Sequence, residues 1–190
     1  MAFFKEELLN VKAFVFDVDG VLSRDVSPLD SNGEPMRTAN VKDGYAIRNA
    51  IAQGFPIAII SGGKNENIRK RHQYLGISDI YIGVKDKITS FNEFIDLYQI
   101  PASAVLFMGD DLPDLELMEI CGIPTCPSDA VTEIKLAAKY ISDRNGGEGC
   151  VRDVIEQVLR AQEKWNSSPS YCFSPACITS GRCKRSPLSR

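Results

Sequence analysis

Two aspartates separated by one residue, Asp17 and Asp19, follow the apolar segment 11–16 and precede Gly20. The apolar segment predicts a buried strand, so both carboxylates stand where the strand ends and the glycine lets the chain turn. Buried charge is costly unless it is paired or bound to a cation. One carboxylate can accept a phosphoryl group as a nucleophile, while the other transfers protons. The pair therefore predicts a site for a metal, a proton or both, although acids that only cap a strand end share this pattern.

A second polar group follows the apolar segment 56–60, where Ser61 and Gly62 precede a predicted helix. A hydroxyl and successive backbone N–H groups at such a turn can bind phosphate. Further along, Lys87 could balance the charge of a phosphate and of nearby carboxylates. Each feature is also common without function, as a strand-to-helix turn or an exposed lysine, and Lys85 competes with Lys87.

Three acids, Asp110, Asp111 and Asp114, follow the apolar segment 104–108. Carboxylate oxygens suit Mg²⁺, which keeps several waters and takes few protein ligands. The alternative is an acidic helix N-terminus, which the helix dipole favours. That alternative explains Asp114, but it does not explain two adjacent acids at a strand end.

Strand and helix patterns alternate along the chain, with apolar strands that indicate burial on both faces. The order predicts an α/β fold, a Rossmann-like doubly wound parallel sheet with helices on both faces. In such a sheet ligands bind beyond the carboxyl ends of the strands, where all the polar groups above fall. The predicted strands are 12–17, 56–60, 79–83, 104–108, 123–126 and 140–142, and the predicted helices are 43–53, 65–75, 88–98, 113–121, 129–139 and 151–164.

Two segments depart from this alternation. The polar segment 24–40 contains Asn32-Gly33, which predicts a β-hairpin. Residues 166–190 form a Ser/Cys-rich basic tail that we expect to be disordered, with a zinc knuckle as the minor alternative. The folded domain is therefore expected to span 1–165.

Composition narrows the class of protein. The chain has 190 residues, of which 44% are hydrophobic and 25% charged, as expected for one compact domain. A net charge of −3 gives no sign of nucleic-acid binding. We find neither an apolar run long enough to span a bilayer nor a signal peptide, so we expect no membrane partner and a cytoplasmic location. Cys121, Cys126 and Cys150 fall in apolar or Gly-rich segments and are expected to be buried.

Taken together, the four polar groups, in this order and each at or just after a strand end, resemble the motifs of the haloacid dehalogenase superfamily of phosphotransferases. The resemblance covers about residues 10–160. It implies a Mg²⁺-dependent phosphatase in which Asp17 is nucleophile and metal ligand, and Asp19 is general acid/base and binds metal through its backbone carbonyl. It further implies that Ser61, Gly62 and Lys87 bind phosphate and that Asp110 is the remaining metal ligand. Asp111 or Asp114 would support the metal site without binding the metal directly.

No segment between these motifs is long enough for a folded cap domain, so the chain resembles the capless members. The segments 40–47, 109–114 and 146–152 resemble those of the 3-deoxy-D-manno-octulosonate 8-phosphate (KDO 8-phosphate) phosphatases. That resemblance implies a sugar-phosphate substrate, a role in lipopolysaccharide precursor synthesis, and a homotetramer in which the hairpins form a central barrel. It also implies that Arg152 reaches a neighbour's site, while Arg71 is a second candidate for the sugar carboxylate. One departure is Gly63-Lys64 after the second motif, where many relatives carry an arginine after the glycine.

Other functions stay open at this point. The nearest alternative keeps the chemistry but takes a nine-carbon, sialic-acid-type keto-sugar 9-phosphate. A catalytically silent regulatory homologue is disfavoured because the motif residues are intact. A response-regulator-like receiver domain fits poorly because its acid pair ends the first strand, whereas the paired acids Asp110 and Asp111 come late in this chain.

Overall fold

The computed structural model describes residues 6–167, which fold around a six-stranded parallel sheet with the strand order β3-β2-β1-β4-β5-β6. Every strand predicted from the sequence is present, with bounds that shift by about one residue, a shift common at element ends. The strands are β1 Ala13–Phe16, β2 Ile57–Ser61, β3 Asp79–Ile82, β4 Val105–Met108, β5 Ile123–Cys126 and β6 Tyr140–Ile141.

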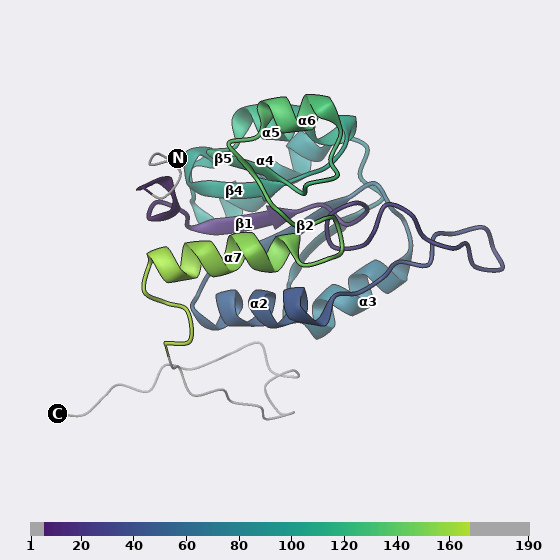
Figure 1. Ribbon diagram of the computed structural model, residues 1–190, viewed down its shortest axis with the longest axis horizontal. Coiled ribbons are helices and arrows are strands. Elements are labelled where there is room, and N and C mark those ends of the chain that lie inside the picture. The colour runs from purple at the N-terminus through teal and green to yellow at the C-terminus, as the bar shows by residue number, and fades with distance from the viewer. Residues whose placement is uncertain (1–5, 168–190) are drawn as a thin grey trace.

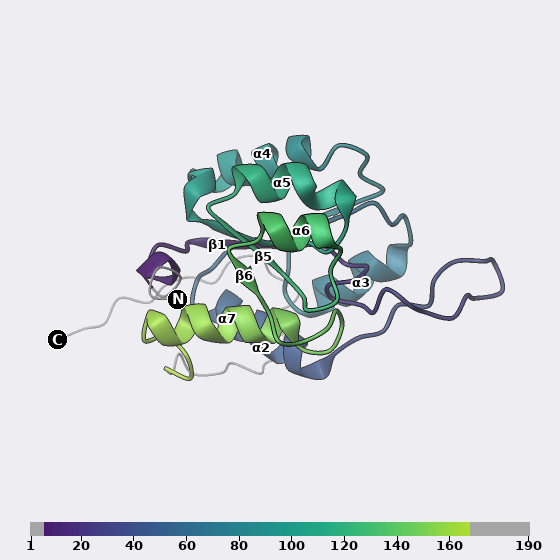
Figure 2. The ribbon, with the colours of Figure 1, turned by 45° about the horizontal axis from the view of Figure 1, so that its top comes forward.

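Helices cover both faces of the sheet, which confirms the doubly wound fold (Figures 1 and 2). One layer holds α2, α3 and α7, and the opposite layer holds α4, α5 and α6. The helices are α2 Val41–Ala52, α3 Glu66–Tyr74, α4 Lys87–Tyr98, α5 Leu115–Ile120, α6 Thr132–Ala137 and α7 Cys150–Ala161, with short 3₁₀ turns at Ala102–Ala104 and Leu112–Asp114.

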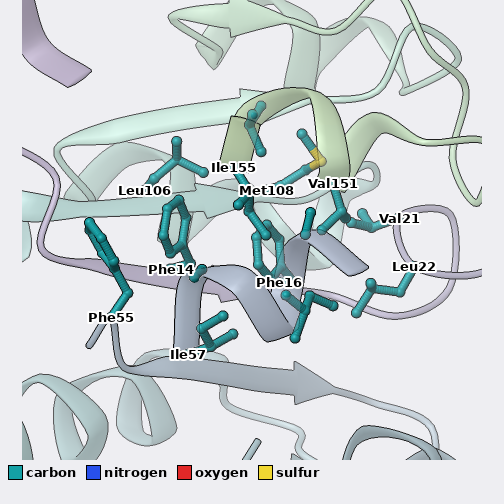
Figure 3. Packing of buried hydrophobic residues seen from close by; sticks show 14 of the residues in the cluster. Phe14, Phe16, Val21, Leu22, Phe55, Ile57, Leu106, Met108, Val151 and Ile155 are labelled. Atoms are coloured by element: carbon teal, nitrogen blue, oxygen red, sulfur yellow. The ribbon is translucent and has the colours of Figure 1, made fainter. Parts of the chain in front are cut away.

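Alternation of side chains along the strands divides the core into two layers. Phe14 and Phe16 of β1 face α2 and α7, where Val151 and Ile155 pack against them (Figure 3). The intervening Val15 faces the opposite helices. Because both faces of β1 are buried, the strand is rigidly held and its end is a firm support for the residues that follow.

The segment 24–40 projects from the strand ends as a long loop (Figure 1). Its two arms run antiparallel, with a backbone bridge between Leu29 and Pro35 and a turn in which Gly33 has a φ of +80°. The predicted hairpin is therefore present as a single bridge rather than as two regular strands. Apolar side chains on it, Val26, Leu29 and Met36, are 80%, 64% and 54% exposed.

Three predicted helices need correction, and the last of them, predicted over 151–164, ends at Ala161. The helix predicted over 113–121 begins as a 3₁₀ turn and becomes α-helical only at Leu115, after the proline. The helix predicted over 129–139 is confined to Thr132–Ala137, and Asp129 does not cap it. Instead, an Asp129 carboxylate oxygen accepts a hydrogen bond from the backbone N–H of Gly146, which ties the Gly-rich segment before α7 to this end of the sheet.

Cys121, Cys126 and Cys150 are buried and free, as predicted. The predicted tail beyond residue 167, with Cys172, Cys177 and Cys183, lies outside the described residues. Within the part of the chain that the structure describes, no helix is both long and apolar enough to cross a membrane.

Candidate active site

The sequence order of the strands reverses at β1, which lies between β2 and β4. The crevice at such a reversal, beyond the carboxyl ends of the strands, is where open α/β sheets bind ligands. Asp17 directly follows β1, Ser61 ends β2, and Asp110 lies just beyond β4. Lys87 begins α4, which follows β3. The fold thus brings residues that are far apart in the sequence to one edge of the sheet.

Three acids meet at this edge. One carboxylate oxygen from each of Asp17, Asp110 and Asp114 lies within 4.8 Å of the others. Lys87 joins them: its Nζ lies 2.6 Å from Asp114 Oδ1 and 3.3 Å from Asp17 Oδ1. Asp17, Lys87 and Asp114 are all buried. Both oxygens of Asp114 are bound, because Oδ1 faces Lys87 and Oδ2 accepts a hydrogen bond from the backbone N–H of Asp110 at 3.0 Å.

The burial of this cluster disturbs its ionisation. Desolvation, with the charge of Asp114 added, raises the pKa of Asp17 to about 7 despite the opposing effect of Lys87. Desolvation and the charges of Asp17, Asp114 and Asp111 raise the pKa of Asp110 to about 8. Burial alone would lower the pKa of Lys87, but the charges of Asp17 and Asp114 raise it. Three acids therefore share one lysine in a site that water solvates poorly.

This charge imbalance is what a divalent cation would correct. Three carboxylates and one ammonium leave two uncompensated negative charges when all are ionised. Hard carboxylate oxygens from Asp17 and Asp110 suit Mg²⁺. Both oxygens of Asp114 already accept hydrogen bonds, so Asp114 fits the outer role of orienting Asp110 and Lys87. The donor set fits a hard divalent cation.

Gly20 is required for this arrangement. Its φ is +76°, a left-handed conformation, and a Cβ placed on it would lie 1.9 Å from Asp110 Oδ2. The close approach brings the turn after β1 against the acid that follows β4.

Beside the acids, Ser61 ends β2 with its side chain buried. Its hydroxyl oxygen accepts the N–H of Gly63 at 3.1 Å, and its carbonyl accepts the N–H of Val84. These bonds fix the turn that contains Gly62. A hydroxyl and a tight turn at the strand end form the local geometry expected of a phosphate-binding loop.

Comparisons with known proteins agree with this geometry. Residues 63–155 match the family model of the haloacid dehalogenase-like hydrolases. The chain is 36% identical over 155 residues to the 3-deoxy-D-manno-octulosonate 8-phosphate phosphatase KdsC of Escherichia coli K12, covering 82% of each chain. The chain belongs to the haloacid dehalogenase-like hydrolases. Within that family it falls in the branch of the KDO 8-phosphate phosphatases.

Solved structures of this branch have the same fold. The KDO 8-phosphate phosphatase of Yersinia pestis superposes with a TM-score of 0.82 at 32% identity, over 86% of this chain and 88% of the other. The enzyme of Moraxella catarrhalis, in a complex with magnesium, phosphate and KDO, gives 0.82 at 31% identity, over 87% and 95%. The α/β fold and the family predicted from the sequence are therefore confirmed.

In this haloacid dehalogenase-like hydrolase, the carboxylate of Asp19 does not join the other acids. It is bound by Arg37 from the 24–40 loop, whose Nε and Nη2 each donate to one Asp19 oxygen at 2.8 Å. Arg37 was not predicted from the sequence. A single arginine inside a polar loop has no pattern that would have identified it, because its contact depends on how the whole loop folds back.

The remaining candidates lie outside the buried cluster. Asp111 is exposed, and its side chain accepts the N–H of Leu112, so it caps the 3₁₀ turn, while its charge still contributes to the raised pKa of Asp110. The Arg152 guanidinium pairs with Glu156 at 3.0 Å and lies over the Trp165 ring. Within one chain Arg152 therefore has structural partners and does not reach the acids.

Arg71 lies elsewhere, in the wall of a cavity of about 410 Å³ between the 24–40 loop, α2 and α3. Arg37 lines the same cavity, together with the amides of Asn40, Asn65 and Asn67. Its volume falls in the range that takes a small ligand. The cavity thus adjoins Asp19 through Arg37.

Proposed function

We propose that the chain is a Mg²⁺-dependent phosphatase that hydrolyses 3-deoxy-D-manno-octulosonate 8-phosphate to the free sugar acid and phosphate. The observation that carries this proposal is the meeting of Asp17, Asp110, Asp114 and Lys87 in one buried cluster next to Ser61. The names of the relatives supply the substrate, since the E. coli and Y. pestis proteins are KDO 8-phosphate phosphatases. The nine-carbon alternative has no such support among the relatives described above.

In this proposal Asp17 attacks the phosphorus atom, and the bond from phosphorus to the sugar oxygen breaks. Asp19 gives a proton to the departing oxygen, so that the sugar leaves as an alcohol. Asp17 then carries the phosphoryl group as an acyl phosphate. Asp19, now ionised, takes a proton from water, whose oxygen attacks the phosphorus; the bond from phosphorus to the Asp17 oxygen breaks, and phosphate is released. Both acids end in their starting states.

The other residues bind and orient. Ser61, the N–H groups of the turn at Gly62, and Lys87 would hold the phosphoryl oxygens in line with Asp17. Asp114 fixes Lys87 through the 2.6 Å ion pair. Asp17, Asp110 and the backbone carbonyl of Asp19 would hold Mg²⁺, which when bound neutralises the charge of the carboxylates and of the phosphate together.

We assign the sugar carboxylate to Arg71. Arg71 lines the cavity that adjoins Asp19 through Arg37, and among the described residues it forms no hydrogen bond or ion pair. A guanidinium can bind a carboxylate with two parallel hydrogen bonds. Arg152 is the weaker candidate, since it would first have to leave Glu156 and Trp165.

We further propose a homotetramer built on the 24–40 loops. The exposed Val26, Leu29 and Met36 support this, because apolar side chains gathered on a projecting loop are typical of a surface that a partner covers. Light scattering of the purified protein tests it, and a monomer in solution would contradict it. The cytoplasmic location stays a prediction.

A phosphate-release assay over sugar phosphates tests the function. We expect turnover of KDO 8-phosphate with Mg²⁺, loss of turnover on adding EDTA, and its recovery when Mg²⁺ is restored. Side-by-side kcat/KM values on KDO 8-phosphate and the nine-carbon 9-phosphate decide the substrate. A higher value on the latter would overturn the substrate, and no release from any phosphomonoester would overturn the hydrolase and favour a silent homologue.

A further inference from the structure

Arg37 makes a contact that the proposed mechanism does not use. Its guanidinium binds both oxygens of Asp19, at 2.8 Å each, in the fork-to-fork geometry of a strong ion pair. The Arg37 side chain is only 14% exposed, whereas that of Asp19 is 45% exposed. The arginine is thus packed into the protein surface, and the carboxylate still faces the open side of the site.

The position of Arg37 depends on Gly63. A Cβ on Gly63 would lie 2.6 Å from Arg37 Nη2 and 2.9 Å from the Ile68 side chain, so any side chain there would displace the guanidinium. Arg37 therefore occupies the space beside the turn at Ser61–Gly63 that a larger residue at position 63 would fill. The Arg37 guanidinium thus borders three features: the Ser61–Gly63 turn, Asp19 and the cavity.

This ion pair conflicts with one step of the proposed mechanism. To give a proton to the departing sugar oxygen, Asp19 must present a protonated carboxyl oxygen to it. While Arg37 donates to both oxygens, neither oxygen is free to face the departing sugar oxygen. Releasing Asp19 without another anion for Arg37 would leave a poorly hydrated guanidinium unpaired, which is costly.

A substrate with a second anionic group removes this conflict. The cavity that Arg37 lines also holds Arg71, and a carboxylate has enough acceptor positions for both guanidinium groups. We propose that Arg37 is a specificity residue that exchanges partners: it binds Asp19 in the free protein and the carboxylate of the sugar acid in the complex. Asp19 is released only when that carboxylate is present. This inference rests on the proposed phosphatase function and adds to it a reason why acidic sugar phosphates are preferred over neutral ones.

The test compares two phosphomonoesters that differ in the carboxylate, 6-phosphogluconate and glucose 6-phosphate, together with KDO 8-phosphate. In Arg37→Ala we expect kcat/KM to fall about 10- to 100-fold on the two acidic substrates, as for the loss of charged hydrogen bonds. On glucose 6-phosphate, kcat/KM should stay within about threefold or rise, because Asp19 is no longer held. Arg37→Lys should be intermediate on the acids, since lysine keeps the charge but not the fork.

Arg24→Ala is the matched control. Arg24 lies on the same loop and also pairs with an acid, Glu148 at 3.0 Å, but its side chain is 57% exposed. We expect all three substrates to stay within about threefold of wild type. Equal losses on acidic and neutral substrates in Arg37→Ala would mean that Arg37 acts through Asp19 or through the fold. That result, or no change on any substrate, would overturn the proposal.

The outcomes separate this inference from the proposed function. If wild type releases phosphate from 6-phosphogluconate but not from KDO 8-phosphate, the assigned substrate is wrong, and the ratio of acidic to neutral sugar phosphate still decides the role of Arg37. If wild type hydrolyses nothing, the phosphatase proposal fails, and calorimetric binding of free KDO decides instead. Weaker binding to Arg37→Ala than to wild type and Arg24→Ala would support the exchange, and equal binding would overturn it.

Discussion

Without a cation, the acidic cluster should destabilise the fold, and Asp110→Asn should relieve this. The pKa of Asp110 is raised from 3.8 to about 8, chiefly by desolvation and then by the charge of Asp17. At pH 7 the folded protein therefore keeps a proton that the unfolded chain has lost. The free energy of unfolding therefore decreases as the pH rises from about 4 to about 8, because the folded state binds more protons than the unfolded chain over that range.

The size of the effect follows from the same shift. The interval from 3.8 to pH 7 is about three units at roughly 1.4 kcal/mol each, or on the order of 4 kcal/mol. Asp17 contributes to this penalty and remains in the variant, so removing one acid recovers part of it. We expect Asp110→Asn to raise the free energy of unfolding by about 2–4 kcal/mol in EDTA at pH 7.

Urea unfolding, followed by circular dichroism, measures this difference. The gain should shrink at pH 5, where the penalty is small. Added Mg²⁺ should stabilise wild type by about 2.7 kcal/mol at a hundredfold excess over Kd, but stabilise the variant much less. Asp111→Asn is the matched control, because Asp111 is exposed and asparagine caps a turn equally well. Its gain in EDTA should be smaller than that of Asp110→Asn, since the charge of Asp111 contributes less than desolvation, Asp17 and Asp114 to the raised pKa of Asp110. An Asp110→Asn protein no more stable than wild type in EDTA at pH 7 would show that the ionised cluster does not destabilise the fold.

Three further substitutions test the site. Asp17→Asn should abolish phosphate release while leaving the circular dichroism spectrum unchanged, because the amide is a poor nucleophile; near-normal kcat would reject this assignment. Lys87→Ala should lower kcat by roughly 10²–10³, as for other lost electrostatic donors, and a change below tenfold would place Lys87 outside the reaction. Gly20→Ala should weaken Mg²⁺ binding in titrations and reduce activity, since its Cβ would meet Asp110 Oδ2 at 1.9 Å; unchanged Mg²⁺ dependence would contradict this role of Gly20.

The sheet and its functional edge were predictable from the sequence because both follow from local rules. Continuous apolar runs indicated strands buried on both faces. Polar residues directly after Phe16 and Met108 had to lie at the carboxyl ends of parallel strands, and β1 and β4 are neighbours that pair Phe16 with Met108. The convergence of Asp17 and Asp110 thus needed only the strand order in addition to the sequence.

The separate roles of Asp111 and Asp114 could not be read from the sequence. Either acid could cap the turn or support a metal, since both follow the same strand. Their positions in the 3₁₀ turn separate them. Asp111 stands at the start of the turn and caps it, whereas Asp114 stands at its end and binds Lys87 and the backbone N–H of Asp110.

The two acids of the first motif differ for a reason that lies outside the motif. Asp17 is buried among acids and one lysine, whereas Asp19 is half-exposed and bound by an arginine from a loop. Carboxylates placed in different environments can take different roles, one as a nucleophile and one as an acid and base. Local sequence supplies the two carboxylates, but α4 and the 24–40 loop supply their partners.

The loop that makes Asp19 different also carries the exposed apolar residues proposed to join subunits. The proposed assembly and the proposed release of Asp19 therefore involve the same segment. A Leu29→Asp variant that changes the oligomeric state in light scattering should also change the ratio of kcat/KM on acidic and neutral sugar phosphates, and an unchanged ratio would separate the two roles of the loop.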